Sequence, residues 1–172
     1  MHRGEVFSPR RPRGGAKITV GRWKGVGLSL FSLFVGVVVG GYLFDQSQPR
    51  SFLSINHCDH CLNAKDLAGL LTSVGVHKMP GLIPSVVFES EKTIVIKNPR
   101  PESRFDYILI PKKDIKNIGD LTEEDAPYLI DVYLVARTIV EKEKVSNYRL
   151  FTNGPGFQDA TYLHFHLLMA KQ

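Results

Sequence analysis

Apolar residues along the chain form one long uninterrupted stretch, followed by a series of shorter segments with regular polar spacing. Residues 25–44 contain no charged side chain. A helix rises 1.5 Å per residue, so such a stretch spans about 30 Å, the thickness of a bilayer core. We therefore expect a transmembrane helix over residues 25–44, a linker over 45–55 and a folded domain over 56–172. Residues 1–24 form a basic N-terminal tail.

A cleaved signal peptide is the alternative interpretation of the apolar stretch, but no Ala-x-Ala-like cleavage site follows it. Residues 1–24 carry seven Lys and Arg against one acidic residue, whereas residues 45–172 carry fifteen against sixteen. Because positive flanks favour the cytoplasmic side, we expect the domain of a single-pass membrane protein on the extracytoplasmic side. The nearly neutral domain argues against a nucleic-acid partner.

The periodicity beyond the apolar stretch predicts an α+β domain with about five antiparallel strands and two helices. A helix opening at Thr122, with capping-box character, is expected to reach about residue 142. Its apolar face is predicted from Leu129, Tyr133, Ala136 and Val140. The other expected elements are a helix over 62–73 that ends near Gly75, a hairpin over 85–97, a central strand over 107–111 and a strand over 148–152.

The segment from Thr161 to Leu168 alternates strictly between polar and apolar residues, which is typical of a half-buried strand. Its polar face carries Tyr162, His164 and His166, and its apolar face carries Leu163, Phe165 and Leu167. Residues two apart on a strand lie about 6–7 Å apart, so both histidines can contact one phosphate. The preceding turn, Asn153–Gln158, contains glycines whose backbone N–H groups can approach an anion.

These residues resemble the histidine triad (HIT) superfamily of nucleotide hydrolases and nucleotidyl transferases, whose motif is His-φ-His-φ-His-φ-φ with φ apolar. The segments Asn98–Pro101 and Asp106–Asp114 resemble its central strand pair, which ends in Ile-Pro-Lys-x-His. The resemblance covers about residues 56–172. It implies a HIT-like fold, a nucleotide-like small molecule as ligand, no required cofactor, and a homodimer with a continuous sheet.

The chain departs from the family pattern at three positions. Tyr162 stands where the first histidine of the triad is expected, and Asp106 and Asp114 replace the histidines that open and close the central strand. We expect both aspartates to be solvated. Tyr162 is the altered support of the nucleophile, because its phenol can both donate and accept a hydrogen bond.

The resemblance also implies the roles of the site residues. His164 would attack the α-phosphate and form a nucleotidyl–histidine intermediate, since a neutral imidazole is not repelled by a phosphoryl group. His166 would donate to a non-bridging oxygen, and Tyr162 would support the nucleophile. The predicted contacts to phosphate or ribose come from Gln158, Asn98, Asn153 and the backbone amides of Gly154 and Gly156.

Cys58 and Cys61 form a second candidate site, because two cysteines three apart can bind one zinc ion. In zinc-bearing relatives the other ligands are the histidines that Asp114 and Tyr162 replace here. A disulfide is the competing interpretation outside the cytoplasm, and free core thiols are the third.

Three functions remain open from the sequence. The first is a membrane-anchored, HIT-like hydrolase or nucleotidyl transferase acting on a phosphoramidate or phosphoanhydride. The second is a nucleotide-binding module with weak or no turnover, which the replacement at Tyr162 favours. The third is a metal or thiol protein centred on Cys58 and Cys61.

Overall fold

The computed structural model describes residues 21–50, 63–83, 85–101 and 105–170, and the chain divides into two compact units, Met1–Val39 and Gly40–Gln172. The helix α1 (Gly21–Phe44) begins in the first unit and ends in the second. Within it, the 19 residues Val26–Phe44 are long and apolar enough to cross a membrane, judged by length and composition. A signal sequence near an N-terminus shares both properties, so α1 is a candidate span.

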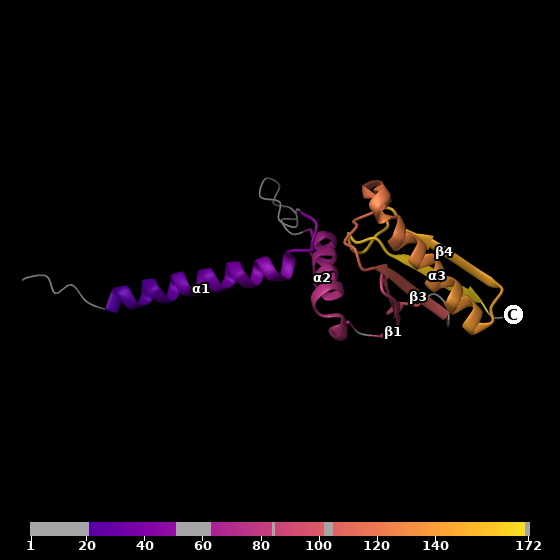
Figure 1. The fold of residues 1–172 in the computed structure, drawn as a ribbon, viewed down its shortest axis with the longest axis horizontal. Coiled ribbons are helices and arrows are strands. Elements are labelled where there is room, and N and C mark those ends of the chain that lie inside the picture. The colour runs from indigo at the N-terminus through magenta and orange to yellow at the C-terminus, as the bar shows by residue number, and fades with distance from the viewer. Residues whose placement is uncertain (1–20, 51–62, 84, 102–104, 171–172) are drawn as a thin grey trace, which may run out of the picture. The chain divides into compact units, whose positions relative to one another are not determined.

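The second unit is built on one antiparallel sheet with the order β1-β2-β3-β5-β4 (Figure 1). The alternating segments predicted five strands, and five are present among the described residues. β3 lies at the centre, as expected for the Ile-Pro-Lys segment, and β5 pairs with both β3 and β4. The strands are β1 (Val86–Glu89), β2 (Thr93–Lys97), β3 (Phe105–Pro111), β4 (Asn147–Thr152) and β5 (Phe165–Ala170).

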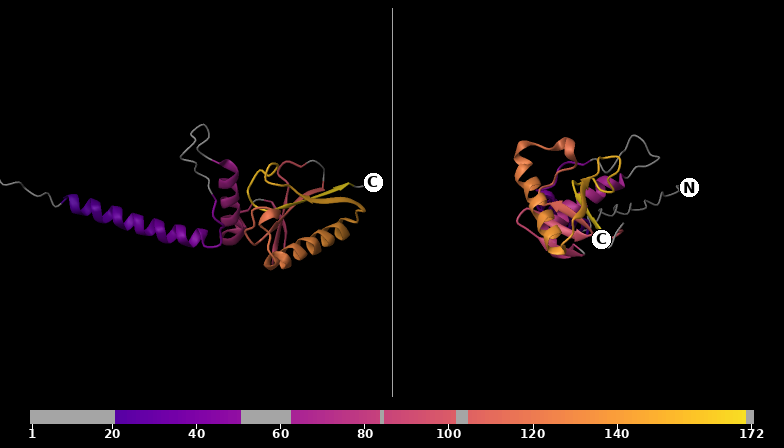
Figure 2. Two further views of the ribbon diagram at one scale, coloured as in Figure 1. Left: turned by 90° about the horizontal axis from the view of Figure 1, so that it is seen from above. Right: turned by 90° about the vertical axis from the view of Figure 1, so that its right-hand side faces the viewer.

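The helix α3 (Ala126–Glu143) covers one face of this sheet (Figure 2). The predicted capping box is confirmed at Thr122 and Asp125, in the short 3-10 helix Glu123–Asp125 that leads into α3. The prediction for Tyr133 was wrong, because its side chain is 61% exposed. The sheet instead fixes a neighbouring stripe of α3 as the buried one: Val132, Val135, Ala136 and Ile139, with Leu129 and Val140 partly buried beside them.

The helix α2 (Ala64–Lys78) packs near the opposite face of the sheet, where Val76 joins a cluster with Ile94, Ile110 and Tyr162. The sequence placed the end of this helix near Gly75, and the helix continues for another three residues. Burial of Val76, which is 4% exposed, favours the extra turn over a stop at glycine. Met79 ends the helix immediately before Pro80, where proline disfavours helical backbone in the preceding residue.

Candidate active site

The segment that carries the histidines is irregular before it becomes a strand. β5 begins at Phe165, so His164 precedes it, whereas the alternation predicted a strand from Thr161. Side-chain hydrogen bonds and long-range backbone bonds replace strand pairing here, including Leu163 N–H to the carbonyl of Ile115 at 2.6 Å. The expected division of faces is nevertheless confirmed: Leu163, Phe165 and Leu167 join the core under α3, and Tyr162, His164 and His166 line a pocket.

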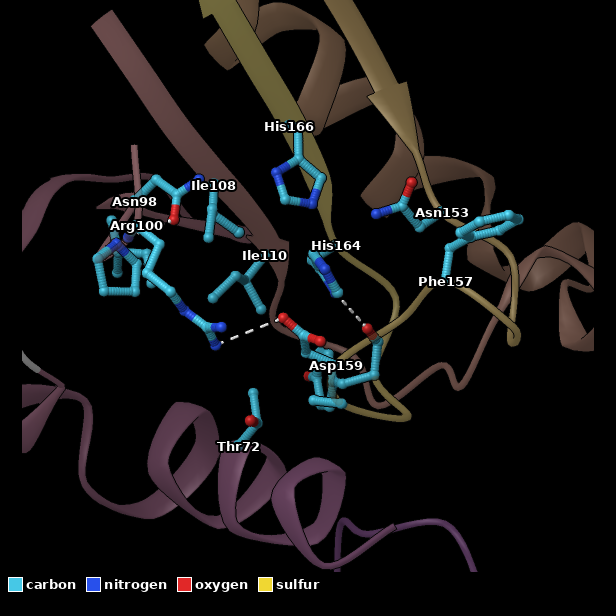
Figure 3. Close-up of a pocket in the computed structure, with 14 residues that line it drawn as sticks. Thr72, Asn98, Arg100, Ile108, Ile110, Asn153, Phe157, Asp159, His164 and His166 are labelled. Atoms are coloured by element: carbon cyan, nitrogen blue, oxygen red, sulfur yellow. Dashed lines mark hydrogen bonds and ion pairs between the residues drawn. The ribbon is translucent and has the colours of Figure 1, made fainter. Parts of the chain in front are cut away.

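The imidazole of His164 is held by a backbone carbonyl. Its Nδ1 lies 2.7 Å from the carbonyl oxygen of Tyr162 (Figure 3, dashed line). A carbonyl oxygen can only accept, so this hydrogen bond assigns the ring proton to Nδ1. In the neutral imidazole, Nε2 then carries the free lone pair that a nucleophile requires.

Burial lowers the pKa of His164 below its ordinary value, because the pocket disfavours the charged imidazolium. The carbonyl of Tyr162 and the carboxylate of Asp159 oppose this shift without reversing it, while the neighbouring His166 adds to it. His164 is therefore neutral at pH 7 and carries the lone pair in the protonation state suited to attack on phosphorus.

His166 is fixed by two ring contacts. It stacks on Phe151 of β4 with a centroid distance of 5.1 Å and an interplanar angle of 15°. The ring of His164 meets it edge-on, also at 5.1 Å. The Nε2 atom of His166 is buried and has no hydrogen-bond partner among the described residues. An oxygen atom of a bound ligand would supply that hydrogen-bond partner.

The pocket around the two histidines has a volume of about 380 Å³, within the range of small-molecule sites. One wall is apolar and comes from β2 and β3, through Ile96, Ile108 and Ile110. Figure 3 labels Ile108 and Ile110 in this wall. Thr72 of α2 contributes from the helical side. An apolar wall next to two imidazoles can hold a flat base while the histidines meet a phosphate.

Two predicted ligand residues, Asn98 and Asn153, do line this pocket. Asn98 follows the last residue of β2, and its amide nitrogen donates to Oδ2 of Asp106 at 2.9 Å. Its amide oxygen accepts from the backbone N–H of Arg100 at 3.0 Å. These two bonds fix the Asn98 amide in a single orientation at the edge of the pocket.

The structure does not bring Gln158, Gly154 or Gly156 into the lining of the pocket. The Gln158 amide nitrogen instead donates to the carbonyl of Lys116 at 3.2 Å, and its side chain is buried. The carbonyl of Gly154 accepts from the N–H groups of Phe157 and Gln158, which closes the turn. Neither glycine has positive φ, and a Cβ at either position would meet nothing within 4 Å.

Tyr162 lines the pocket, but its phenol is hydrogen-bonded to Pro111 and not to His164. The hydroxyl donates to the carbonyl of Pro111 at 2.9 Å, and the residue is 1% exposed. Burial raises the pKa of the phenol, and the nearby carboxylate of Asp114 adds to the shift. The hydroxyl therefore stays protonated, and the contact of Tyr162 with the nucleophile runs through its main-chain carbonyl.

The expectation that Asp106 and Asp114 are solvated was wrong, because they are 1% and 3% exposed. Asp106 bonds to Asn98, as above, and Asp114 forms a two-pronged ion pair with Arg50. A buried carboxylate requires such partners, since an unpaired charge is costly away from water. The sequence separation of 64 residues between Arg50 and Asp114 left no local signal for the pair.

Zinc is not supported. Cys58 and Cys61 lie outside the described residues, and among the residues described no three His, Cys, Asp or Glu side chains come together as a metal site. The two positions that resemble zinc ligands are engaged otherwise, Asp114 by Arg50 and Tyr162 by Pro111. The residues seen around Asp114 thus suit a guanidinium and not a metal ion.

Sequence reasoning missed the charged mouth of the pocket. Arg100 and Asp159 approach each other there, with Nη2 and Oδ2 3.6 Å apart, and both side chains are more than four-fifths exposed (Figure 3). Phe157 also lines the pocket, and 85% of its surface is exposed. Asp159 follows Gln158 directly in the glycine turn, and that position was the only sequence signal for it.

The chain is similar to known proteins in both sequence and fold. Residues 82–172 match the family model described as "Scavenger mRNA decapping enzyme C-term binding". An uncharacterized HIT-like protein of Chlamydia muridarum is 30% identical over 108 residues, which cover 60% of this chain and 86% of that protein. The crystal structure of a HIT family hydrolase from Legionella pneumophila has a TM-score of 0.51 at 33% identity, covering 54% of this chain and 88% of that one.

A more distant relative is the mouse adenosine 5'-monophosphoramidase HINT3, 23% identical over 83 residues that cover 46% of this chain and 50% of that protein. Fold and pocket define a small α+β protein with one five-stranded antiparallel sheet and two histidines that line a pocket beside it. The family model covers more than half of the chain and the chlamydial relative is matched over most of its length. The chain belongs to the histidine triad (HIT) superfamily.

Proposed function

We propose that this protein is a membrane-anchored nucleotide hydrolase or nucleotidyl transferase that acts through a nucleotidyl–His164 intermediate. The hydrogen bond from Nδ1 of His164 to the Tyr162 carbonyl carries this proposal. It leaves Nε2 unprotonated on a residue that lines the pocket, and burial keeps the ring neutral.

In the first step, the Nε2 lone pair of His164 forms a bond to the α-phosphorus while the bond to the leaving group breaks. The imidazole becomes positively charged, and the Tyr162 carbonyl that accepts from Nδ1 stabilises that charge. An amine leaving group takes a proton from solvent. In the second step, the oxygen of water or of another acceptor attacks phosphorus and gives its proton to solvent, while the bond from phosphorus to Nε2 breaks and restores the neutral imidazole.

The surrounding residues take supporting roles in this proposal. His166 would donate from Nε2 to a non-bridging phosphate oxygen, which would give that buried atom its missing partner. Asn153 would lie beside the phosphate and Asn98 beside the ribose, and the isoleucine wall would receive the base; all of these residues line the pocket. Gln158, Gly154 and Gly156 would act by shaping the turn, since none of them lines the pocket.

A phosphoramidate is the substrate class that we favour. Asp159 and Arg100 form an exposed ion pair without net charge at the mouth, which suits an amine leaving group that departs without negative charge. The name of the mouse relative, an adenosine 5'-monophosphoramidase, points in the same direction.

The membrane anchor in this proposal is α1. Its segment Val26–Phe44 contains no charged residue, and the basic residues 1–24 precede it. These features favour a single-pass protein with an extracytoplasmic domain.

A homodimer is also proposed, since β4 is an edge strand with β5 on one side, and its residues Asn147, Tyr148 and Arg149 are exposed.

A nucleotide-binding module without turnover is the second candidate. The observation that favours it is the placement of Gln158 and the two glycines outside the pocket lining, which leaves fewer groups to stabilise a transition state. Such a module would retain the apolar wall and Asn98 and would bind nucleotide without cleaving it.

The test is turnover of adenosine 5'-phosphoramidate by the full chain in detergent. We expect AMP release by the wild type, and loss of at least about a thousandfold in His164→Ala, because the nucleophile is removed. His77→Ala is the matched control, since His77 bonds to Ser73 within α2 and does not line the pocket. Nucleotide binding with equal inactivity of wild type and His164→Ala would support the binding module instead.

A further inference from the structure

A buried arginine beside the catalytic segment has no part in the chemistry described so far. The side chain of Arg50 is 1% exposed, and its guanidinium forms a two-pronged ion pair with Asp114. The backbone of Gln48 is hydrogen-bonded to both members of this pair. Nη1 of Arg50 donates to the carbonyl of Gln48 at 3.1 Å, and the N–H of Gln48 donates to Oδ2 of Asp114 at 2.9 Å.

The same guanidinium also holds the peptide that leads into Tyr162. Nε and Nη2 of Arg50 both donate to the carbonyl oxygen of Thr161, at 3.0 and 2.7 Å. On its other side, the N–H of Thr161 donates to the carbonyl of Lys65 at 3.0 Å. Gly69 packs so closely against this point that a Cβ there would lie 2.5 Å from the Thr161 oxygen. The Thr161 peptide is therefore fixed from three directions.

This fixed peptide lies one residue before the carbonyl that orients the nucleophile. The Tyr162 carbonyl accepts from Nδ1 of His164, and both residues precede the first residue of β5. No ladder of strand hydrogen bonds sets their position, so the direction of the Tyr162 carbonyl depends on the peptides around it. Among the described residues, Arg50 is the charged group that bonds to this stretch of backbone.

We propose that Arg50 is a positioning residue for His164: it holds the Thr161 peptide so that the Tyr162 carbonyl keeps the imidazole proton on Nδ1. A guanidinium suits this task, because it can bind a carboxylate with two donors and still direct others at a carbonyl, whereas a lysine ammonium cannot. The inference rests on the proposed function for its kinetic consequence. It also makes residues 48–50, a few positions after α1, a working part of the site.

The test compares three variants of the full chain in detergent. The double variant Arg50→Met/Asp114→Leu removes both charges together, which avoids leaving one buried charge unpaired. Arg50→Lys retains the positive charge but lacks the paired N–H donors of the guanidinium. Lys78→Gln is the matched control. Lys78 of α2 pairs with Asp45, which lies five residues before Arg50, and no bond from Lys78 to residues 160–164 is seen. Thermal unfolding by circular dichroism reports whether each variant is folded.

We expect the double variant to lose kcat by on the order of 10- to 100-fold, the cost of a small misplacement of a reacting group, with KM changed less than about threefold. The kcat of Arg50→Lys should lie between that of the double variant and that of the wild type, and Lys78→Gln should have wild-type kcat. A role confined to fold stability would lower the unfolding temperature and leave kcat of the folded protein unchanged, which would overturn the proposal.

A second readout does not require activity. Nitrogen-15 NMR of His164 should show the Nδ1–H tautomer in the wild type and in Lys78→Gln, and a mixture of tautomers in the double variant. If the wild type turns over no substrate, the proposed function fails, and this tautomer readout still decides the role of Arg50. If the double variant does not fold, Arg50→Lys decides it: a wild-type tautomer and kcat in that variant would contradict the proposal.

Discussion

A single main-chain carbonyl sets the chemical state of the candidate nucleophile. It belongs to Tyr162, the residue that replaces a triad histidine, and it accepts from Nδ1 of His164 at 2.7 Å. Any residue at position 162 has this main-chain carbonyl, whatever its side chain. The replacement therefore leaves the support of His164 in place, because that support comes from the backbone and not from the phenol.

The pH profile follows from the pKa of His164. Burial lowers this pKa, so the acid limb of kcat/KM should have its midpoint below the ordinary imidazole value of about 6.5. For stability, the native state favours the neutral ring. The contribution of His164 is therefore fully present above the unfolded pKa and is lost as pH falls towards the folded one. A kcat/KM profile between pH 4 and 8 measures the limb.

The variant Asp159→Asn serves as the control for this assignment. The Asp159 carboxylate raises the pKa of His164, against the dominant effect of burial. Removing its charge should therefore move the acid limb to still lower pH. A limb at or above pH 6.5 in the wild type, or one that moves upward in Asp159→Asn, would contradict the role given to His164.

Substitution of Tyr162 distinguishes the role of its phenol from the role of its main-chain carbonyl. Tyr162→Phe removes the hydrogen bond to the Pro111 carbonyl and leaves that buried oxygen without its partner. We expect a loss of about 1–3 kcal/mol in the free energy of unfolding, with kcat retained within about threefold. Urea denaturation and steady-state kinetics on one preparation measure both. A loss of kcat as large as that of His164→Ala would show that the hydroxyl itself takes part.

The sequence predicted part of the site at this scale. Strict alternation placed His164 and His166 on one face, and the structure brings them together with Asn98 and Asn153. Arg50 could not be found in the same way, because its role depends on contacts 64 and 111 residues away along the chain. Gln158 matched the motif by spacing, but spacing does not define the direction of a side chain.

At the scale of elements, the type and order of helices and strands were predictable, and several boundaries were not. The hairpin of β1 and β2, the central β3, β4 and α3 all follow from periodicity. The start of β5 and the end of α2 depend on tertiary packing instead. Long-range bonds to Lys65 and Ile115 hold residues 161–163 out of the strand, and burial of Val76 extends the helix past Gly75.

The buried face of α3 offers a test at this scale. Ile139 is 7% exposed within the core, whereas Tyr133, expected there from spacing alone, is 61% exposed. Ile139→Ala should lower the free energy of unfolding by about 2–5 kcal/mol through lost burial and a cavity. Tyr133→Ala should change it by less than about 0.5 kcal/mol. Chemical denaturation measures both, and a larger effect of Tyr133→Ala would contradict the observed phase of the helix.

At the scale of the whole molecule, a HIT domain follows an apolar helix in one chain. The helix could be predicted from the absence of charge over residues 25–44, since that signal needs no tertiary information. Length and composition do not distinguish a retained span from a cleaved signal sequence.

Membrane association of the mature protein tests the proposed anchor. We expect the full chain to stay in the membrane fraction after an alkaline carbonate wash, with an intact mass that includes residues 21–44. Val35→Arg, which places a charge within the apolar segment, should reduce insertion by about 2.5–3.5 kcal/mol. A mature protein that is released by the wash and begins after residue 44 would show that α1 belongs to a signal sequence.

The central claim is the covalent intermediate on His164, and rapid quenching followed by peptide mass spectrometry tests it most directly. The full chain is mixed with adenosine 5'-phosphoramidate and quenched at high pH, where a phosphorus–nitrogen bond to histidine survives. We predict an adenylyl group on the peptide that carries His164 in the wild type, accumulating in His166→Ala if that change slows the second step, and absent in His164→Ala. AMP release without any labelled histidine, or a label on His166 alone, would contradict the account.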